Sequence, residues 1–125
     1  MSVPYAFSLH GKEEIDAVVG VLKKNTALGD NTKQFEQKIA KIFGKKYGVM
    51  VNSGSSANLL AFELLNLPRG SEVITPILTF STTIAPILQK GLVPVFVDIE
   101  KNTYLVNIEQ IEKAITKKTR VLMIP

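Results

Sequence analysis

Residues 47–125 alternate short apolar runs with amphipathic stretches, and this alternation leaves few folds open. Four apolar runs have the length of strands, and they lie at residues 47–51, 72–75, 93–98 and 120–124. Three helical patterns separate them, at residues 55–66, 81–90 and 107–115. The runs are continuously apolar, which is typical of strands that are covered on both faces. Because parallel strands need a crossover between them, the order β-α-β-α-β-α-β predicts an α/β fold with a three-layer, mostly parallel sheet.

Residues 1–46 have a different pattern, with amphipathic helices predicted at residues 12–24 and 31–43. Gly44 is placed to end the second helix. We therefore divide the chain into an N-terminal helical segment, residues 1–46, and the first part of an α/β domain, residues 47–125, within one domain overall. The last predicted strand reaches Pro125 without a following helix. We expect the sheet to be truncated and the chain to be the N-terminal part of a longer protein.

Composition excludes several classes of site. No cysteine is present, which excludes disulfides, thiolate catalysis and Cys-based zinc sites. The formal charge of +4 comes from lysines that are mostly interleaved with acidic residues, so we expect no nucleic-acid partner. His10 is the only histidine, and we expect no metal site. With no signal pattern and no apolar run near the length of a membrane span, we expect a cytoplasmic protein that does not bind membranes.

The segment Asn52–Asn58 follows a predicted strand and opens a predicted helix. Gly54 allows a tight turn or a positive φ, while Ser55 and Ser56 present hydroxyls beside the unpaired amides of a first helical turn. The helix dipole adds partial positive charge there, so a phosphate is a natural ligand. The alternative is an ordinary serine N-cap. The segment is neither a Walker loop nor the dinucleotide fingerprint, because it lacks the Gly-Lys-Ser/Thr end of the first and the spaced glycines of the second.

Two further positions lie at the expected carboxyl edge of the sheet, where ligands bind in such folds. Phe80 follows the second predicted strand and could offer its ring face to a flat ligand; the alternative is a core residue. Asp98 ends the third predicted strand, where it could bind a hydroxyl or a cation, or cap the following turn. A Ser-His-Asp triad would have to use His10, and no nucleophile elbow is present.

Four motifs together resemble the DegT/DnrJ/EryC1/StrS family of pyridoxal-phosphate sugar aminotransferases. They are residues 51–61 (Val-Asn-Ser-Gly-Ser-Ser-Ala-Asn-Leu-Leu-Ala), 70–76 (Gly-Ser-Glu-Val-Ile-Thr-Pro), 79–83 (Thr-Phe-Ser-Thr-Thr) and 91–98 (Gly-Leu-Val-Pro-Val-Phe-Val-Asp). The resemblance covers about residues 29–125 and implies the large domain of the aspartate-aminotransferase fold, fold type I. The sequences of these motifs are most similar to those of the 3-dehydrases of deoxysugar pathways, which use pyridoxamine phosphate.

This resemblance implies a function. Gly54, Ser55 and Ser56 would hold the phosphate of pyridoxal or pyridoxamine 5′-phosphate (PLP or PMP), and Phe80 would stack on its ring. The loop at residues 25–30 would border a sugar-nucleotide pocket, usually in a homodimer. We expect part of an aminotransferase or 3-dehydrase for lipopolysaccharide or O-antigen sugars. The family's catalytic Lys or His would lie beyond residue 125, so we expect no catalytic residue here and no turnover by this chain alone. A non-catalytic phosphate-binding or scaffolding domain and a Rossmann-like nucleotide domain are the alternatives.

Overall fold

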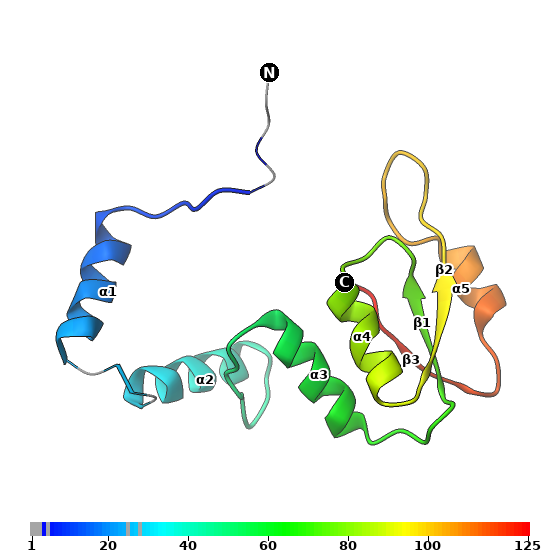
Figure 1. Cartoon of the computed structure of the whole chain (residues 1–125), viewed down its shortest axis with the longest axis horizontal. Coiled ribbons are helices and arrows are strands. Elements are labelled where there is room, and N and C mark those ends of the chain that lie inside the picture. Colours follow the sequence, from blue (N-terminus) through cyan, green and yellow to red (C-terminus); the bar gives the residue numbers. More distant parts are fainter. Residues whose placement is uncertain (1–3, 5, 25, 28) are drawn as a thin grey trace. The chain divides into compact units, whose positions relative to one another are not determined.

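A computed structural model describes residues 4, 6–24, 26–27 and 29–125 of the chain. These residues belong to two compact units, Met1–Met50 and Val51–Pro125, and we treat each unit by itself (Figure 1). The predicted loop at residues 25–30 falls partly outside the described residues, so the expectation that it borders a pocket stays a prediction.

The first unit contains the two predicted helices, α1 at Lys12–Lys24 and α2 at Asp30–Ile42. Acidic side chains occupy the first turn of α1 and lysines its last turn, as the helix dipole favours. The amide of Gly11 donates to the carboxylate of Glu14 over 2.7 Å. This hydrogen bond lowers the pKa of Glu14. After α2 the chain turns at Gly44, whose φ of +61° confirms the predicted helix end.

The strand predicted at residues 47–51 is wrong. This segment runs without strand pairing, and Tyr47, Val49 and Met50 are exposed. A strand exists only through its ladder of hydrogen bonds, and no strand among the described residues pairs with this apolar run. Instead the amide of Met50 donates to the side chain of Glu36 on α2, over 2.8 Å.

The second unit is built on three parallel strands, β1 at Glu72–Pro76, β2 at Val93–Val97 and β3 at Thr119–Leu122. They lie in the order β2-β1-β3, with Ile74 of β1 opposite Val95 on one side and Leu122 on the other. The predicted parallel sheet is therefore confirmed with three of its four strands. β1 is the central strand and is almost completely buried.

Helices cover both faces of this sheet. They are α3 at Gly54–Leu65, α4 at Ser81–Gln89 and α5 at Ile108–Ala114. The chain passes from the central strand β1 to β2 through α4, and then from β2 to β3 on the other side of β1 through α5. Because the two connections run in opposite directions across the sheet and each is right-handed, α4 and α5 lie on opposite faces of the sheet, as Figure 1 shows. α3 packs on α4. The core between these two helices and the sheet is formed by Phe62, Val73, Ile87 and Leu92.

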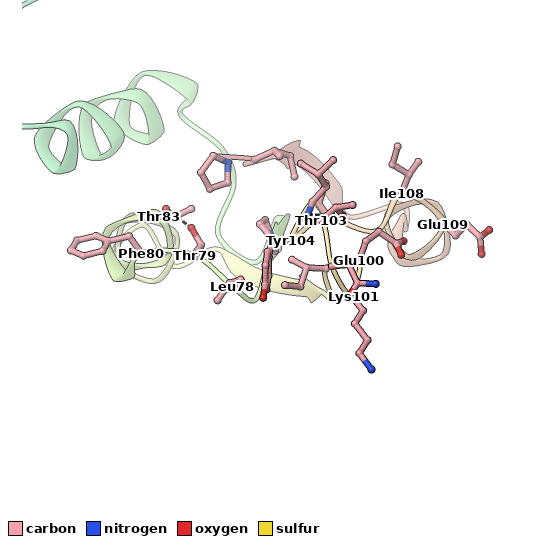
Figure 2. A pocket seen from close by; sticks show the side chains of 17 residues that line it. Leu78, Thr79, Phe80, Thr83, Glu100, Lys101, Thr103, Tyr104, Ile108 and Glu109 are labelled. Carbon is pink, nitrogen blue, oxygen red and sulfur yellow. Dashed lines mark hydrogen bonds between the residues drawn. The ribbon is translucent and has the colours of Figure 1, made fainter. Parts of the chain in front are cut away.

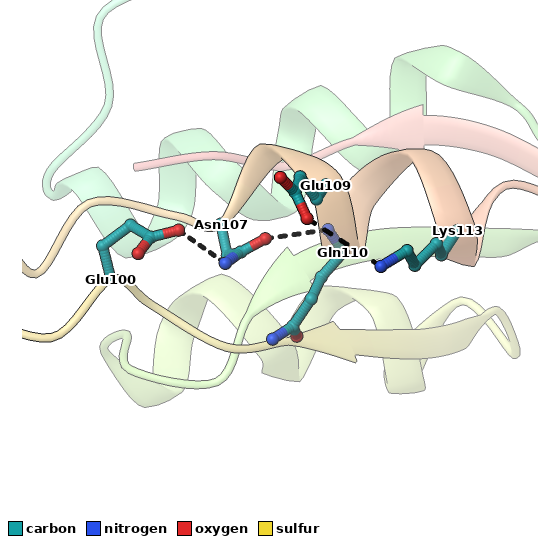
Figure 3. Close-up of polar contacts among 5 residues, drawn as sticks. All are labelled: Glu100, Asn107, Glu109, Gln110 and Lys113. Atoms are coloured by element: carbon teal, nitrogen blue, oxygen red, sulfur yellow. Dashed lines mark hydrogen bonds and ion pairs between the residues drawn. The ribbon is translucent and has the colours of Figure 1, made fainter.

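The connection after β2 is a hairpin-like loop, residues 98–107, closed by an antiparallel bridge between Ile99 and Val106. It ends at Asn107, whose side-chain oxygen accepts from the amide of Gln110 over 2.9 Å and so caps α5 (Figure 3). The amide nitrogen of the Asn107 side chain donates to Glu100. The cap thus also fastens the loop. In the part of the chain that the structure describes, no helix is long and apolar enough to cross a membrane.

Candidate functional site

The first turn of α3 carries three of the predicted site residues. The Ser53 hydroxyl accepts from the amide of Ser56 over 3.1 Å, which confirms the N-cap interpretation. The Ser56 hydroxyl in turn donates to the side-chain oxygen of Asn52 over 2.6 Å. The amides of Gly54 and Ser55 donate to no atom of the described residues. The cap therefore uses one first-turn amide and leaves two for an anion.

Of the two roles predicted for Gly54, a tight turn or a positive φ, the positive φ is wrong. Its φ is not positive, unlike that of Gly44, Gly70 and Gly91. A Cβ built at Gly54 would meet no atom within 4 Å. The open space beside Gly54, next to two unpaired amides and the positive end of the α3 dipole, suits the oxygens of a phosphate group.

Phe80 lies just before α4, and the alternative that it belongs to the core is wrong, because 68% of its surface is exposed. Its loop is nevertheless well held. The hydroxyl of Thr79 donates to that of Thr83 over 2.9 Å, and the amide of Thr83 donates to the carbonyl of Phe80 over the same distance. Figure 2 shows the ring projecting outward from the start of α4. A firmly held backbone with an open ring face is suitable for stacking on a flat ligand.

The structure connects α3 and α4 near their starts, where the predicted site residues lie. The side-chain amide of Asn58 donates to the carbonyl of Thr82, two residues after Phe80, over 3.3 Å. A small hollow of about 200 Å³ lies between the two helices. Its lining includes Ser55 and Ser56 from α3 and Thr82 from α4.

A cleft of about 910 Å³ lies at the carboxyl ends of all three strands (Figure 2). It is lined by the loops that follow β1 and β2 and by the residues after β3. Phe80 lines it, whereas Gly54, Ser55 and Ser56 do not. Of the predicted site residues, Phe80 therefore lines the cleft and Ser55 and Ser56 line the smaller hollow, while Gly54 belongs to neither lining.

Sequence reasoning missed the contribution of the 98–107 loop to this cleft. Tyr104 lies in its lining with 70% of its surface exposed, and it has a positive φ of 59°. Asn102 has a φ of 86°. A bulky residue keeps a left-handed backbone conformation only where surrounding contacts stabilise it. Such a contact is present here, because the amide of Tyr104 donates to the carbonyl of Glu100 over 3.0 Å. No periodic pattern signals such a position.

Thr75 is the second feature that the sequence did not reveal. It lies in β1, completely buried, and its hydroxyl has no hydrogen-bond partner among the described residues. The alternation of the strand puts it on the face of Val73, which packs against Phe62 of α3 and Ile87 of α4. An unsatisfied hydroxyl of this kind requires an explanation.

Two further charged side chains of this unit are engaged in structural contacts. The carboxylate of Asp98 accepts from the amide of Ile99 over 2.8 Å, which is the turn-capping alternative. Lys90 pairs with Glu63 at 2.6 Å. Within the described residues, no three His, Asp or Glu side chains gather as a metal site would require.

Comparison with known proteins assigns a family to these features. The sequence pattern of the DegT/DnrJ/EryC1/StrS aminotransferase family matches residues 9–124. The chain is 41% identical over 129 residues to a dTDP-4-dehydro-2,6-dideoxy-D-glucose 3-dehydratase of Saccharopolyspora spinosa. The aligned region covers 97% of this chain and 28% of that protein.

Solved structures agree with the sequence match. An Escherichia coli GDP-4-keto-6-deoxy-D-mannose-3-dehydratase with bound hydrated PLP superposes with a TM-score of 0.86 at 40% identity, over 97% of this chain and 33% of that one. Spr1654 of Streptococcus pneumoniae in a PMP form superposes with a TM-score of 0.82 at 30% identity, over 97% and 31%. The chain thus has the fold of these PLP proteins, and it spans about a third of the length of the relatives that it matches.

Proposed function

The chain belongs to the DegT/DnrJ/EryC1/StrS aminotransferase family, and we propose that it forms the phosphate and ring-face part of the cofactor site in a sugar-nucleotide 3-dehydratase or aminotransferase. The observation that carries this proposal is the first turn of α3. Two unpaired amides, an open space at Gly54 and the positive end of the helix dipole lie together there. The exposed ring of Phe80 precedes α4, whose first turn is bonded to α3 through Asn58 and Thr82.

The residues present fit PLP or PMP. The amides of Gly54 and Ser55 and the hydroxyl of Ser56 would hold the phosphate, and Phe80 would lie against the pyridine ring. The bound cofactor would supply an electron sink for bond changes beside its amino group. The residues of this chain bind and orient it: the phosphate contacts fix one end, and the ring contact fixes the plane.

We propose a nucleotide-linked 4-keto-deoxysugar as the substrate class, because two relatives are named as 3-dehydratases of such sugars, one linked to dTDP and one to GDP. The products would enter deoxysugar or aminosugar synthesis for lipopolysaccharide. We propose further that the enzyme acts in the cytoplasm as a homodimer, and cell fractionation and sedimentation of the protein test these two statements.

Binding of PMP to the purified chain tests the proposal directly. PMP is preferable to PLP as a probe because it has no aldehyde to react with surface lysines. We expect saturable binding by equilibrium dialysis, with pyridoxamine, which lacks the phosphate, bound at least about tenfold more weakly, since a charge-assisted contact contributes roughly 1.5–3 kcal/mol.

Gly54→Asp isolates the phosphate contact. Its carboxylate would occupy the open space, and an acidic residue in a first helical turn favours the helix, so the fold should persist while PMP binding weakens by about tenfold or more. Asn31→Asp adds the same charge in the first turn of α2 and should leave binding unchanged. Absence of PMP saturation at millimolar concentration, or equal binding by the Gly54 variant and the unmodified chain, would refute the proposal.

A further inference from the structure

We propose that Asn58 is a positioning residue that sets the spacing between the phosphate-binding turn, Gly54–Ser56, and the ring of Phe80. This inference rests on the proposed function, because it concerns how one cofactor reaches both parts of that site. The side chain of Asn58 acts through the carbonyl of Thr82, at a distance of 3.3 Å.

The reason for this contact lies in α4. In a regular helix the carbonyl of Thr82 would accept from the amide of residue 86, but that residue is Pro86, which has no amide hydrogen. The proline therefore leaves one carbonyl of the first turn without its helical partner. The side chain of Asn58 supplies the missing donor from the neighbouring helix. The carbonyl that lacks its partner within α4 is therefore bonded to α3, and this hydrogen bond connects the two helices.

This connection is at the end of the helix pair where the cofactor would bind. α3 and α4 are held by apolar packing in which Phe62 and Ile87 belong to the same core cluster. Polar contacts hold them at both ends. Lys90 pairs with Glu63 at 2.6 Å near the far end, and Asn58 bonds to Thr82 at the near end.

A cofactor with a phosphate on α3 and a ring on α4 is sensitive to this spacing, whereas inorganic phosphate is not. Loss of the Asn58 contact lets the first turn of α4 shift relative to α3, so the two contacts can no longer be made at their best geometry at the same time. A net hydrogen-bond contribution of about 1 kcal/mol corresponds to roughly a fivefold change in affinity.

Asn58→Leu removes the donor and keeps a similar volume at a half-buried position. We expect PMP to bind the full chain about five- to tenfold more weakly, and inorganic phosphate to bind within twofold of the unmodified chain. NMR titrations that follow the amides of Gly54 and Ser55 measure both affinities. Asn58→Gln keeps a donor and should recover part of the PMP affinity. Glu63→Gln removes the charge pairing with Lys90 at the far end of the same helices and should leave both affinities unchanged.

The variant Pro86→Ala separates positioning from stability. It restores the amide that the Thr82 carbonyl lacks, so Asn58→Leu should cost little stability in this background. The loss of PMP affinity should persist, because the cross-helix contact is still missing. The inference would be overturned if Asn58→Leu weakened the binding of PMP and of inorganic phosphate equally. It would also be overturned if Pro86→Ala restored both the stability and the PMP affinity of the Asn58→Leu chain. If the unmodified chain bound no PMP, the proposed function itself would fail.

Discussion

Two buried threonines permit a matched test of the packing around the site. Thr75 on β1 and Thr83 on α4 are both buried, with 0% and 4% of their surfaces exposed. The hydroxyl of Thr83 is bonded to that of Thr79 at 2.9 Å, whereas the hydroxyl of Thr75 has no partner among the described residues. Replacing each by valine changes shape little and exchanges a hydroxyl for a methyl group.

The expected magnitudes follow from this contrast. Both substitutions gain about the same apolar burial, roughly 0.8 kcal/mol. Thr75→Val also removes a buried hydroxyl whose missing hydrogen bond destabilises the unmodified chain by about 1–3 kcal/mol. Thr83→Val instead removes a hydrogen bond that stabilises the unmodified chain by a net of about 1 kcal/mol. We therefore expect Thr75→Val to be more stable than Thr83→Val by about 2–4 kcal/mol in the free energy of unfolding, and Thr75→Val alone to exceed the unmodified chain.

Urea unfolding followed by circular dichroism measures both free energies under one set of conditions. Thermal melting provides a second measure, since 1 kcal/mol shifts the melting temperature of a unit of this size by about 4–8 °C. A Thr75→Val chain that is less stable than the unmodified chain would refute the reasoning. That result would mean that the hydroxyl of Thr75 bonds to a buried water molecule or a ligand.

Three other perturbations test local features of the fold. Ser53→Ala removes the N-cap of α3 and should lower the free energy of unfolding by about 1 kcal/mol, as urea unfolding would show; no loss would contradict the cap. Because the pKa of Glu14 is lowered, its contribution to the stability of α1 is complete above the ordinary pKa of a glutamate and is lost as the pH falls through the lowered value. The helical circular dichroism signal should therefore decrease as the pH falls through that range. Glu14→Gln should abolish this dependence. Gly48→Ala should destabilise the first unit by about 1–3 kcal/mol, because its Cβ would lie 2.6 Å from a backbone oxygen of α2. Gly20→Ala, in open space on α1, should stabilise by up to about 1 kcal/mol. A stabilising Gly48→Ala or a destabilising Gly20→Ala would contradict the packing described.

Local signals in the sequence were sufficient for most of the secondary structure. A cap depends on atoms three residues apart, so the pairing of Asn107 with Gln110 could be predicted from the sequence alone. Apolar periodicity likewise predicted the helices and the three strands of the parallel sheet, within one or two residues at their ends. The serine-capped first turn of α3, which we propose to bind phosphate, also has a local pattern that the sequence shows.

The tertiary structure decided everything that depends on distant partners. Residues 47–51 have the composition of a strand but lack a neighbour to pair with, and composition cannot report a neighbour. The exposure of Phe80 depends on how its loop packs, not on its type. The contact from Asn58 to Thr82 spans 24 residues and arises because a proline removes a donor that another helix must replace. A sequence specifies which groups need partners, and only the fold determines where those partners are.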